Sequence, residues 1–171
     1  MHSNRSGNAA SVLHVIDFLG PGGAQELLRQ VIALTSNSEF DHKVAVLTEH
    51  KPYSDIGLRE AGADAIRYLS DSWGPLLWLS APLLMVRLRK LIKQTEPDIV
   101  HLHLPGSMIT GAGAMTGLEL KKVLGVYAWR QQLPFWVYPT VRLLTPLFDR
   151  LNWKDFSALP WVPEDKRIYV R

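Results

Sequence analysis

The sequence predicts an α/β fold: a Rossmann-like, mainly parallel sheet with helices on both faces, in a single domain. Short runs of β-branched and other apolar residues alternate along the chain with segments whose apolar residues recur at helical spacing. This alternation is typical of βαβ units, and their right-handed crossovers place helices on both faces of the sheet. We expect the domain to span residues 11–171, after a polar leader over residues 1–10 that we expect to be disordered.

The first half of the chain predicts three strands and three helices. The expected strands cover residues 12–16, 42–48 and 65–69. The expected helices cover residues 24–36, 55–61 and about 75–95. Gly62 is a suitable C-terminal cap for the second helix, and Pro97 closes the segment that contains the third.

The second half continues the alternation with shorter elements. The expected strands cover residues 98–103, 126–129 and 167–170. A helix of small residues is expected to follow Pro105, Gly106 and Ser107 and to run to about Leu124. A further helix is expected over residues 141–151, because its apolar residues recur at helical spacing.

Composition narrows the function classes. The chain has 171 residues, a net charge of +3 and no cysteine, which excludes a disulfide scaffold, a thiolate metal site and a cysteine nucleophile. A nucleic-acid binder usually carries a stronger positive excess, so we expect no nucleic-acid partner. The leader lacks the apolar core of a signal peptide, and no apolar run reaches the roughly 20 residues that span a bilayer. We expect a cytoplasmic protein, with peripheral contact to the membrane as an open alternative.

A glycine-rich loop follows the first strand at the point where ligands bind in such sheets. It contains Gly20, Pro21, Gly22, Gly23, Ala24 and Gln25. Glycines let the backbone approach a ligand closely, and the N–H groups of the next helix can bind a phosphate; a plain strand-to-helix turn is the alternative. Gln25 stands where a dinucleotide fingerprint needs a third small residue, which disfavours a nucleotide-dependent oxidoreductase.

A second loop follows the fourth strand. Strand alternation places His101 and His103 on one face, and His103 at the strand end is a candidate to contact a sugar hydroxyl or a phosphate. Ser107 either joins this site or caps the next helix. No third metal ligand is apparent in the sequence, so we expect no metal site.

Three motifs in order resemble the retaining GT-B glycosyltransferases, the large family that includes sucrose and glycogen synthases. The first is Leu13-His14-Val15-Ile16-Asp17 followed by Gly20-Pro21-Gly22-Gly23-Ala24-Gln25, which looks like the family's first strand and its GGAE or GGAQ loop. The second is Leu58-Arg59-Glu60-Ala61-Gly62-Ala63, which is similar to the family's LREAGV. The third is Pro97-Asp98-Ile99-Val100-His101-Leu102-His103, which looks like PDIVHxH.

The resemblance implies one half of a two-domain enzyme. In this family the N-terminal Rossmann-like domain grips the acceptor, and the C-terminal domain binds the nucleotide sugar through a Glu-x7-Glu element that this chain lacks. Residues 163–171 resemble the segment before the crossing into the second domain, so we expect the C-terminal domain to be absent. The implied function is transfer of a sugar from a nucleotide-sugar donor to a hydroxyl acceptor, such as a lipid-linked glycan in cell envelope polysaccharide biosynthesis.

The resemblance also implies that no metal or organic cofactor is needed and that the isolated chain is inactive. A non-catalytic module of a two-chain transferase, binding a partner or a membrane, is the alternative. Many family members place a histidine after the fifth strand, where this chain has Arg130 and Gln131 instead. Arg130 stays protonated and cannot act as a base, although it can hold a phosphate or a carboxylate. His103 and Arg130 are therefore the only candidates for a catalytic role.

An aromatic and basic stretch is the candidate membrane contact. Its residues are Trp73, Trp78, Arg87, Arg89, Lys90 and Lys93. Tryptophans beside cations suit the headgroup region of an anionic bilayer. The alternative is an amphipathic helix that packs its apolar side on the sheet and exposes the cations to solvent.

Overall fold

The computed structural model describes residues 9–36, 40–49, 56–70, 77–126, 135, 137–153 and 161–169. They form one seven-stranded parallel sheet in the order β3-β2-β1-β4-β5-β6-β7. The strands are β1 (Ala10–Ile16), β2 (Phe40–Val46), β3 (Ala63–Tyr68), β4 (Ile99–His103), β5 (Lys121–Val126), β6 (Arg150–Trp153) and β7 (Arg167–Tyr169). The predicted Rossmann-like fold class is confirmed.

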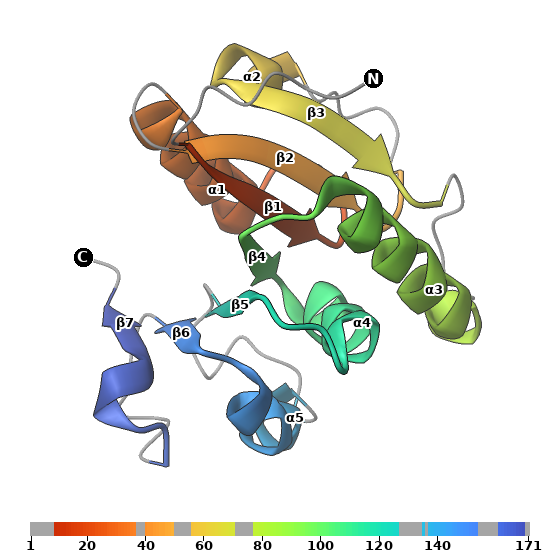
Figure 1. Ribbon diagram of the computed structural model, residues 1–171, viewed down its shortest axis with the longest axis vertical. Helices are drawn as coiled ribbons and strands as arrows, with labels where there is room; N and C mark the ends of the chain where they lie inside the picture. The colour runs from red at the N-terminus through yellow and green to blue at the C-terminus, as the bar shows by residue number, and fades with distance from the viewer. Residues whose placement is uncertain are drawn as a thin grey trace.

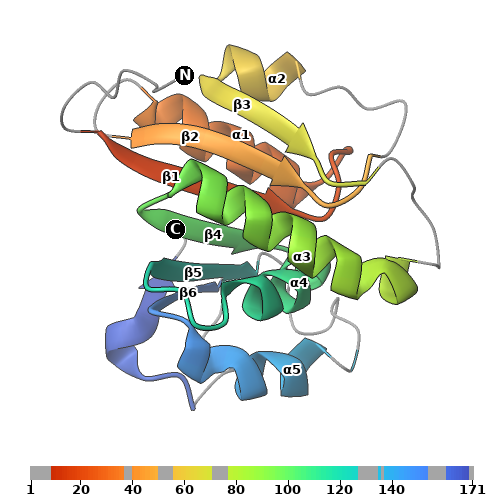
Figure 2. The ribbon, with the colours of Figure 1, turned by 45° about the vertical axis from the view of Figure 1, so that its right-hand side comes forward.

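Helices cover both faces of this sheet (Figures 1 and 2). They are α1 (Gly23–Thr35), α2 (Ile56–Glu60), α3 (Leu77–Thr95), α4 (Pro105–Met115) and α5 (Val137–Leu144), with short 3-10 turns η2 (Thr145–Leu147) and η4 (Glu164–Lys166). Figure 2 shows α3 crossing in front of β1 and β4, while α1 lies behind β1 and β2. Among the described residues, no helix is both long enough and apolar enough to span a membrane.

Each face of the sheet has its own apolar core. On one face, Leu28 and Ile32 of α1 pack with Ile16, Val44 and Val46 of the central strands. On the other face, α3, α4 and α5 pack with the side chains of alternate strand residues, namely Leu13, Val15, Val100, Leu102 and Leu124. Each fully buried Leu or Ile contributes roughly 1.5–3 kcal/mol, so the two cores fix the register of every strand between them.

The small residues of α4 allow this helix to approach its neighbours closely. A Cβ atom on Gly111 would lie 2.5 Å from Leu102 of β4, and one on Gly113 would lie 2.7 Å from Met85 of α3. Glycine at both positions therefore lets α4 sit in the angle between the sheet and α3.

Three predicted boundaries in the second half are wrong. The α4 helix ends at Met115 rather than near Leu124, and the next strand starts at Lys121 instead of Val126. The predicted helix over residues 141–151 is a helix to Leu144, a 3-10 turn and then β6. Pro146 lies in that turn, because proline cannot donate the hydrogen bond that would continue the helix. At the start of the chain, β1 begins at Ala10, inside the predicted leader, whose residues 1–8 lie outside the described residues.

The strand order reverses between β1 and β4. From β1 the chain builds outward through β2 and β3, and it then crosses back through α3 to place β4 on the other side of β1. In open parallel sheets, ligands bind beyond the carboxyl ends of the strands at such a switch. Both loops singled out in the sequence follow these two strands, so the fold brings them to the same edge.

Candidate functional site

The glycine loop after β1 leaves the start of α1 open. Gly22 precedes the helix in extended conformation, and no side chain caps the first N–H groups. Gln25 instead donates from Nε2 to the carbonyl of Phe18 at 3.2 Å, which ties the helix back to the loop. The N-terminus of α1 therefore presents backbone donors and the positive end of the helix dipole.

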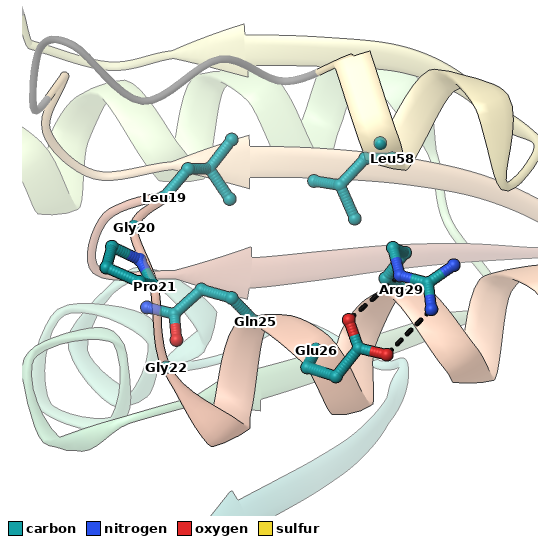
Figure 3. Close-up of a pocket in the computed structure, with 9 residues that line it drawn as sticks. Leu19, Gly20, Pro21, Gly22, Gln25, Glu26, Arg29 and Leu58 are labelled. Carbon is teal, nitrogen blue, oxygen red and sulfur yellow. Dashed lines mark hydrogen bonds and ion pairs between the residues drawn. The ribbon is translucent and has the colours of Figure 1, made fainter.

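A hollow of about 310 Å³ lies beside this helix start (Figure 3). Its lining residues are Leu19, Gly20, Pro21, Gly22, Gln25, Glu26, Arg29, Gly57 and Leu58. Glu26 accepts two hydrogen bonds from Arg29, at 2.9 and 2.7 Å, and one from Gln30 at 2.8 Å. The bonds from Arg29 and then from Gln30 lower the pKa of Glu26 to about 2, so the hollow carries one charge of each sign at neutral pH.

The loop after β4 is closed by a side chain from β1. Asp17, which directly follows β1, accepts hydrogen bonds from the backbone N–H groups of Gly106, at 2.8 Å, and of Ser107. Burial raises the pKa of Asp17 to about 6, although these two bonds act in the opposite direction. The N-terminus of α4 thus already holds an internal carboxylate.

The backbone of this second turn is strained. Leu104 lies between β4 and α4 with φ of 75° and ψ of 160°, a region that glycine enters freely and that costs other residues about 1–3 kcal/mol. The Ser107 hydroxyl donates to the His103 and Leu104 carbonyls, the latter at 2.9 Å. These bonds and the Asp17 carboxylate hold the turn in place.

Below the two loops, histidines from three neighbouring strands form a buried chain of hydrogen bonds. His14 of β1 lies in the middle, with its Nδ1 3.0 Å from Nε2 of His103 and its Nε2 3.0 Å from Nδ1 of His42. Nε2 of His42 in turn lies 2.8 Å from the Thr35 hydroxyl at the end of α1. His14, His42 and His103 are all buried.

The hydroxyl of Thr35 determines which ring nitrogen donates at each hydrogen bond between the histidines. Thr35 uses its single hydrogen to donate to the Val31 carbonyl at 2.6 Å, so its oxygen must accept from Nε2 of His42. A neutral His42 then accepts on Nδ1 from His14, and a neutral His14 accepts on Nδ1 from His103. All three rings are therefore expected in the form that carries hydrogen on Nε2.

Burial is the main reason why these imidazoles stay neutral. It lowers the pKa values of His14 and His103 well below the usual range, and nearby histidine charges lower both further. Burial also lowers the pKa of His42. The pKa of His101, whose ring lies tilted beside that of His103 at 4.0 Å between ring centres, falls to about 4 for the same reason.

The histidine cluster contains a third potential metal ligand, which was not apparent from the sequence. One ring nitrogen from each of His14, His101 and His103 lies within 4.8 Å of the others. Neutral imidazole is the form that binds transition metals. However, no carboxylate joins the group among the described residues. His14 and His103 each already use one ring nitrogen in the hydrogen bond between them. The arrangement fits a hydrogen-bonded polar cluster better than a buried dication.

The structure brings most of the predicted site residues to one edge. Gly20, Gly22, Gly23, Ala24 and Gln25 follow β1, and His103 ends the adjacent parallel strand β4, so the glycine loop and His103 do share a rim. His103 and Ser107 are fully buried, however, and bond within the chain. A ligand on this surface would meet the glycine loop and not these two side chains. Arg130 and Gln131 lie outside the described residues.

The predicted membrane residues that the structure describes have different surroundings, and membrane contact stays a prediction. Arg89 donates to the carbonyls of Ala114 and Thr116, both at 2.8 Å, and so caps the end of α4. Arg87 donates to the Leu69 carbonyl, and Arg87 and Lys90 both line a second hollow. Lys93 is exposed. Trp73 lies outside the described residues, as does the side chain of Trp78 in α3.

Sequence reasoning missed Asp17, His14 and His42. A signal for them was present, because a titratable side chain inside an apolar strand must find a hydrogen-bond partner when the strand is buried. The partner itself depends on which strands are neighbours, and a single sequence does not show strand order.

No protein-family model matches the chain, and no curated protein matches it significantly. Solved structures do match. The UDP-GlcNAc 2-epimerase from Neisseria meningitidis bound to UDP-GlcNAc shares 18% sequence identity with a TM-score of 0.69, over 93% of this chain and 46% of its own. Anabaena Alr3699/HepE in complex with UDP and glucose shares 13% with a TM-score of 0.70, over 93% and 43%.

The lipopolysaccharide outer core galactosyltransferase WaaB in its apo form is similar to the same extent. It shares 14% sequence identity with a TM-score of 0.70, over 92% of this chain and 44% of its own. This chain thus spans about half the length of the solved structures that it matches. At these identities the likeness establishes the fold, and the chain has the Rossmann-like fold of one half of a GT-B protein.

Proposed function

We propose that this chain is the acceptor-binding half of a glycosyltransferase that moves a sugar from a nucleotide-sugar donor to a hydroxyl acceptor. The observation that carries the proposal is the open N-terminus of α1 at the strand-order switch, where ligands of such sheets bind, with a hollow beside it between α1 and α2. Two of the matched structures contain a UDP-sugar or UDP with glucose, which supports a nucleotide sugar as the donor.

In this proposal the chain supplies positioning more than chemistry. The loop from Gly20 to Gln25 offers backbone N–H groups toward a donor phosphate or an acceptor oxygen. The donor is held mainly by an opposing half, and the acceptor is a glycan or a lipid-linked glycan. Arg130 and Gln131 stay proposed contacts. The chain acts at the cytoplasmic side of the cell, in contact with the membrane where the acceptor is lipid-linked.

An epimerase is the second candidate, because UDP-GlcNAc 2-epimerases match this chain as well as the transferases do. The test measures turnover of UDP-glucose and UDP-N-acetylglucosamine by the chain joined to a donor-binding half, from its own polypeptide or a partner chain. A transferase releases UDP only when a hydroxyl acceptor is present. An epimerase needs no hydroxyl acceptor and inverts the sugar at C2, which NMR detects.

The glycine loop is tested in the same assay with Gly22→Ala. A Cβ there would lie 2.5 Å from Oε1 of Gln25 and would push that side chain off the Phe18 carbonyl. We expect kcat/KM to fall roughly tenfold, because a misplaced loop loses about 1.4 kcal/mol of transition-state contact. Leu34→Ala, on the same helix and 83% exposed, is the control. Reduction of NAD, or no turnover of any donor with any acceptor, would refute the proposal.

A further inference from the structure

A second hollow lies on the opposite face of the sheet from α1. It has a volume of about 620 Å³ and lies between α3 and strands β2 and β3. Its cationic residues are Lys43, Arg67, Arg87 and Lys90. No acidic side chain lines it within the part of the chain that the structure describes. The volume falls in the range of small-molecule sites, roughly 300–1,000 Å³.

The fold turns these four cations toward one another. Lys43 and Arg67 lie on the same face of adjacent strands, because Lys43 pairs with Ala65 and Arg67 pairs with Ala45, two residues further along both strands. Arg87 and Lys90 are three residues apart on α3 and so share one side of that helix. Sheet and helix thus contribute two positive charges each.

Nothing on the described protein neutralises the group. No ion pair joins any of the four cations to an acid among the described residues, whereas Arg29 and Arg167 do form such pairs. Arg87 donates one bond to the Leu69 carbonyl, which fixes its guanidinium at the hollow and leaves further N–H donors available. The net charge of the whole chain is +3. The four cations at this hollow therefore carry more positive charge than the protein has in excess.

Apolar side chains complete the lining. Leu13 is buried beneath the cations, and Leu69 and Leu91 are partly buried beside it. Like charges gathered over apolar surface repel one another through a medium of reduced dielectric, and a multivalent anion relieves that repulsion. Guanidinium groups bind carboxylate and phosphate oxygens alike in pairs, and the two negative charges of a phosphate monoester offset four cations better than the single charge of a carboxylate.

We propose that this hollow is a binding site for a phosphate-bearing ligand, separate from the glycine-loop site on the other side of the sheet. The phosphate can belong to a soluble phosphate monoester or to a lipid headgroup that ends in a phosphate monoester, as in phosphatidic acid, and both present the same dianionic group. This proposal does not depend on the glycosyltransferase function.

The test is titration calorimetry of the 171-residue chain with inorganic pyrophosphate, together with co-sedimentation on phosphatidylcholine vesicles with and without phosphatidic acid. The test variant is Arg67→Gln with Lys90→Gln, which removes one cation from the sheet and one from α3. We expect binding to weaken at least roughly tenfold, because the variant loses two charge-assisted contacts to the phosphate. The control, Lys121→Gln with Arg150→Gln, makes the same charge change at exposed positions on β5 and β6.

Each outcome is informative. Saturable pyrophosphate binding that only the test variant loses supports a soluble ligand. Binding confined to vesicles that contain phosphatidic acid, and lost in the same variant, supports a lipid headgroup. No binding of either probe by the native chain overturns the proposal, and so does equal weakening in both variants, because the attraction would then be diffuse. Circular dichroism of both variants checks that the fold is retained.

Discussion

The two strand-to-helix turns at the carboxyl edge of the sheet have opposite designs. After β1, the helix α1 starts without a side-chain cap, beside a hollow. After β4, the helix α4 starts on the carboxylate of Asp17, and His103, the last residue of β4, is bonded to His14. Both turns lie at the strand-order switch, yet only the first leaves its backbone donors for a ligand.

This difference shows that the position of a loop does not by itself identify a binding site. The N-terminus of α4 has the same dipole as any helix start, but Asp17 accepts from its N–H groups at Gly106 and Ser107. The strained backbone of Leu104 is stabilised by those same internal bonds. We infer that the β4–α4 turn is a structural support and that the β1–α1 turn faces the ligand.

The first prediction concerns the pH dependence of folding stability, and it tests the β4–α4 turn and the buried histidines beneath it. The four histidines of the cluster have folded-state pKa values below the unfolded value of about 6.5. The unfolded chain therefore takes up more protons as the pH falls below 6.5, and stability is lost. For His101 alone, a pKa of about 4 corresponds to roughly 3 kcal/mol between pH 7 and 4.

Asp17 acts in the opposite direction. Its folded-state pKa of about 6 lies above the unfolded value of about 3.9, so its contribution is fully present below pH 4 and is lost as the pH rises through 6. Four histidines outweigh one carboxyl, and we expect a net loss of several kcal/mol on acidification, measured by urea unfolding at each pH. In Asp17→Asn the loss between pH 6 and 4 should be steeper. A stability that is flat from pH 7 to 4 would contradict the neutral histidine chain.

The second prediction removes the carboxylate itself. Asp17→Ala leaves the N–H groups of Gly106 and Ser107 without their acceptor, and we expect a loss of about 1–3 kcal/mol at pH 7. Asp17→Asn should cost less, because burial already favours an uncharged group at this position. The comparison at the open turn is Gln25→Ala, which removes the one bond to Phe18 and should cost about 1 kcal/mol or less. Equal losses in Asp17→Ala and Gln25→Ala would remove the distinction between the two turns.

The sequence predicted the parts of the fold that depend on local pattern. The apolar run from Val12 to Ile16, the glycine break and the helical stripe of Leu28 and Ile32 are all local, and all three are observed. Local pattern misleads at β5, whose start was predicted too late, and at β6, which was missed. Lys121 and Lys122 open β5 although both are charged, and Leu151 fits a helical stripe but is buried in β6.

The candidate site could likewise be predicted only where it depends on local sequence. The glycine loop and the shared face of His101 and His103 follow from local spacing, and both are observed. The roles of Asp17 and His14 depend on β1 being the neighbour of β4, across 89 residues of sequence for the His14–His103 contact. When the strand order is unknown, the sequence identifies Asp17 only as a polar residue at the end of a strand.

The third prediction compares a single methyl group at the two turns. A Cβ on Gly106 would lie 2.6 Å from Oδ2 of Asp17, so Gly106→Ala must displace the carboxylate that closes the β4–α4 turn. A Cβ on Gly23, at the start of α1, meets nothing within 4 Å. Forcing an extra methyl into a packed site costs about 1–3 kcal/mol, whereas alanine in place of an unstrained helix glycine stabilises by about 0.4–1 kcal/mol.

We therefore expect the two glycine-to-alanine variants to shift the urea midpoint in opposite directions, with Gly106→Ala below the native chain and Gly23→Ala at or above it. The pair is matched in chemistry, since each variant adds one methyl group near a helix start on the same edge. The sign of the difference reports directly whether the turn is packed or open. If Gly23→Ala proved as damaging as Gly106→Ala, the space beside α1 would already be filled by protein, and that turn would have no room for a ligand.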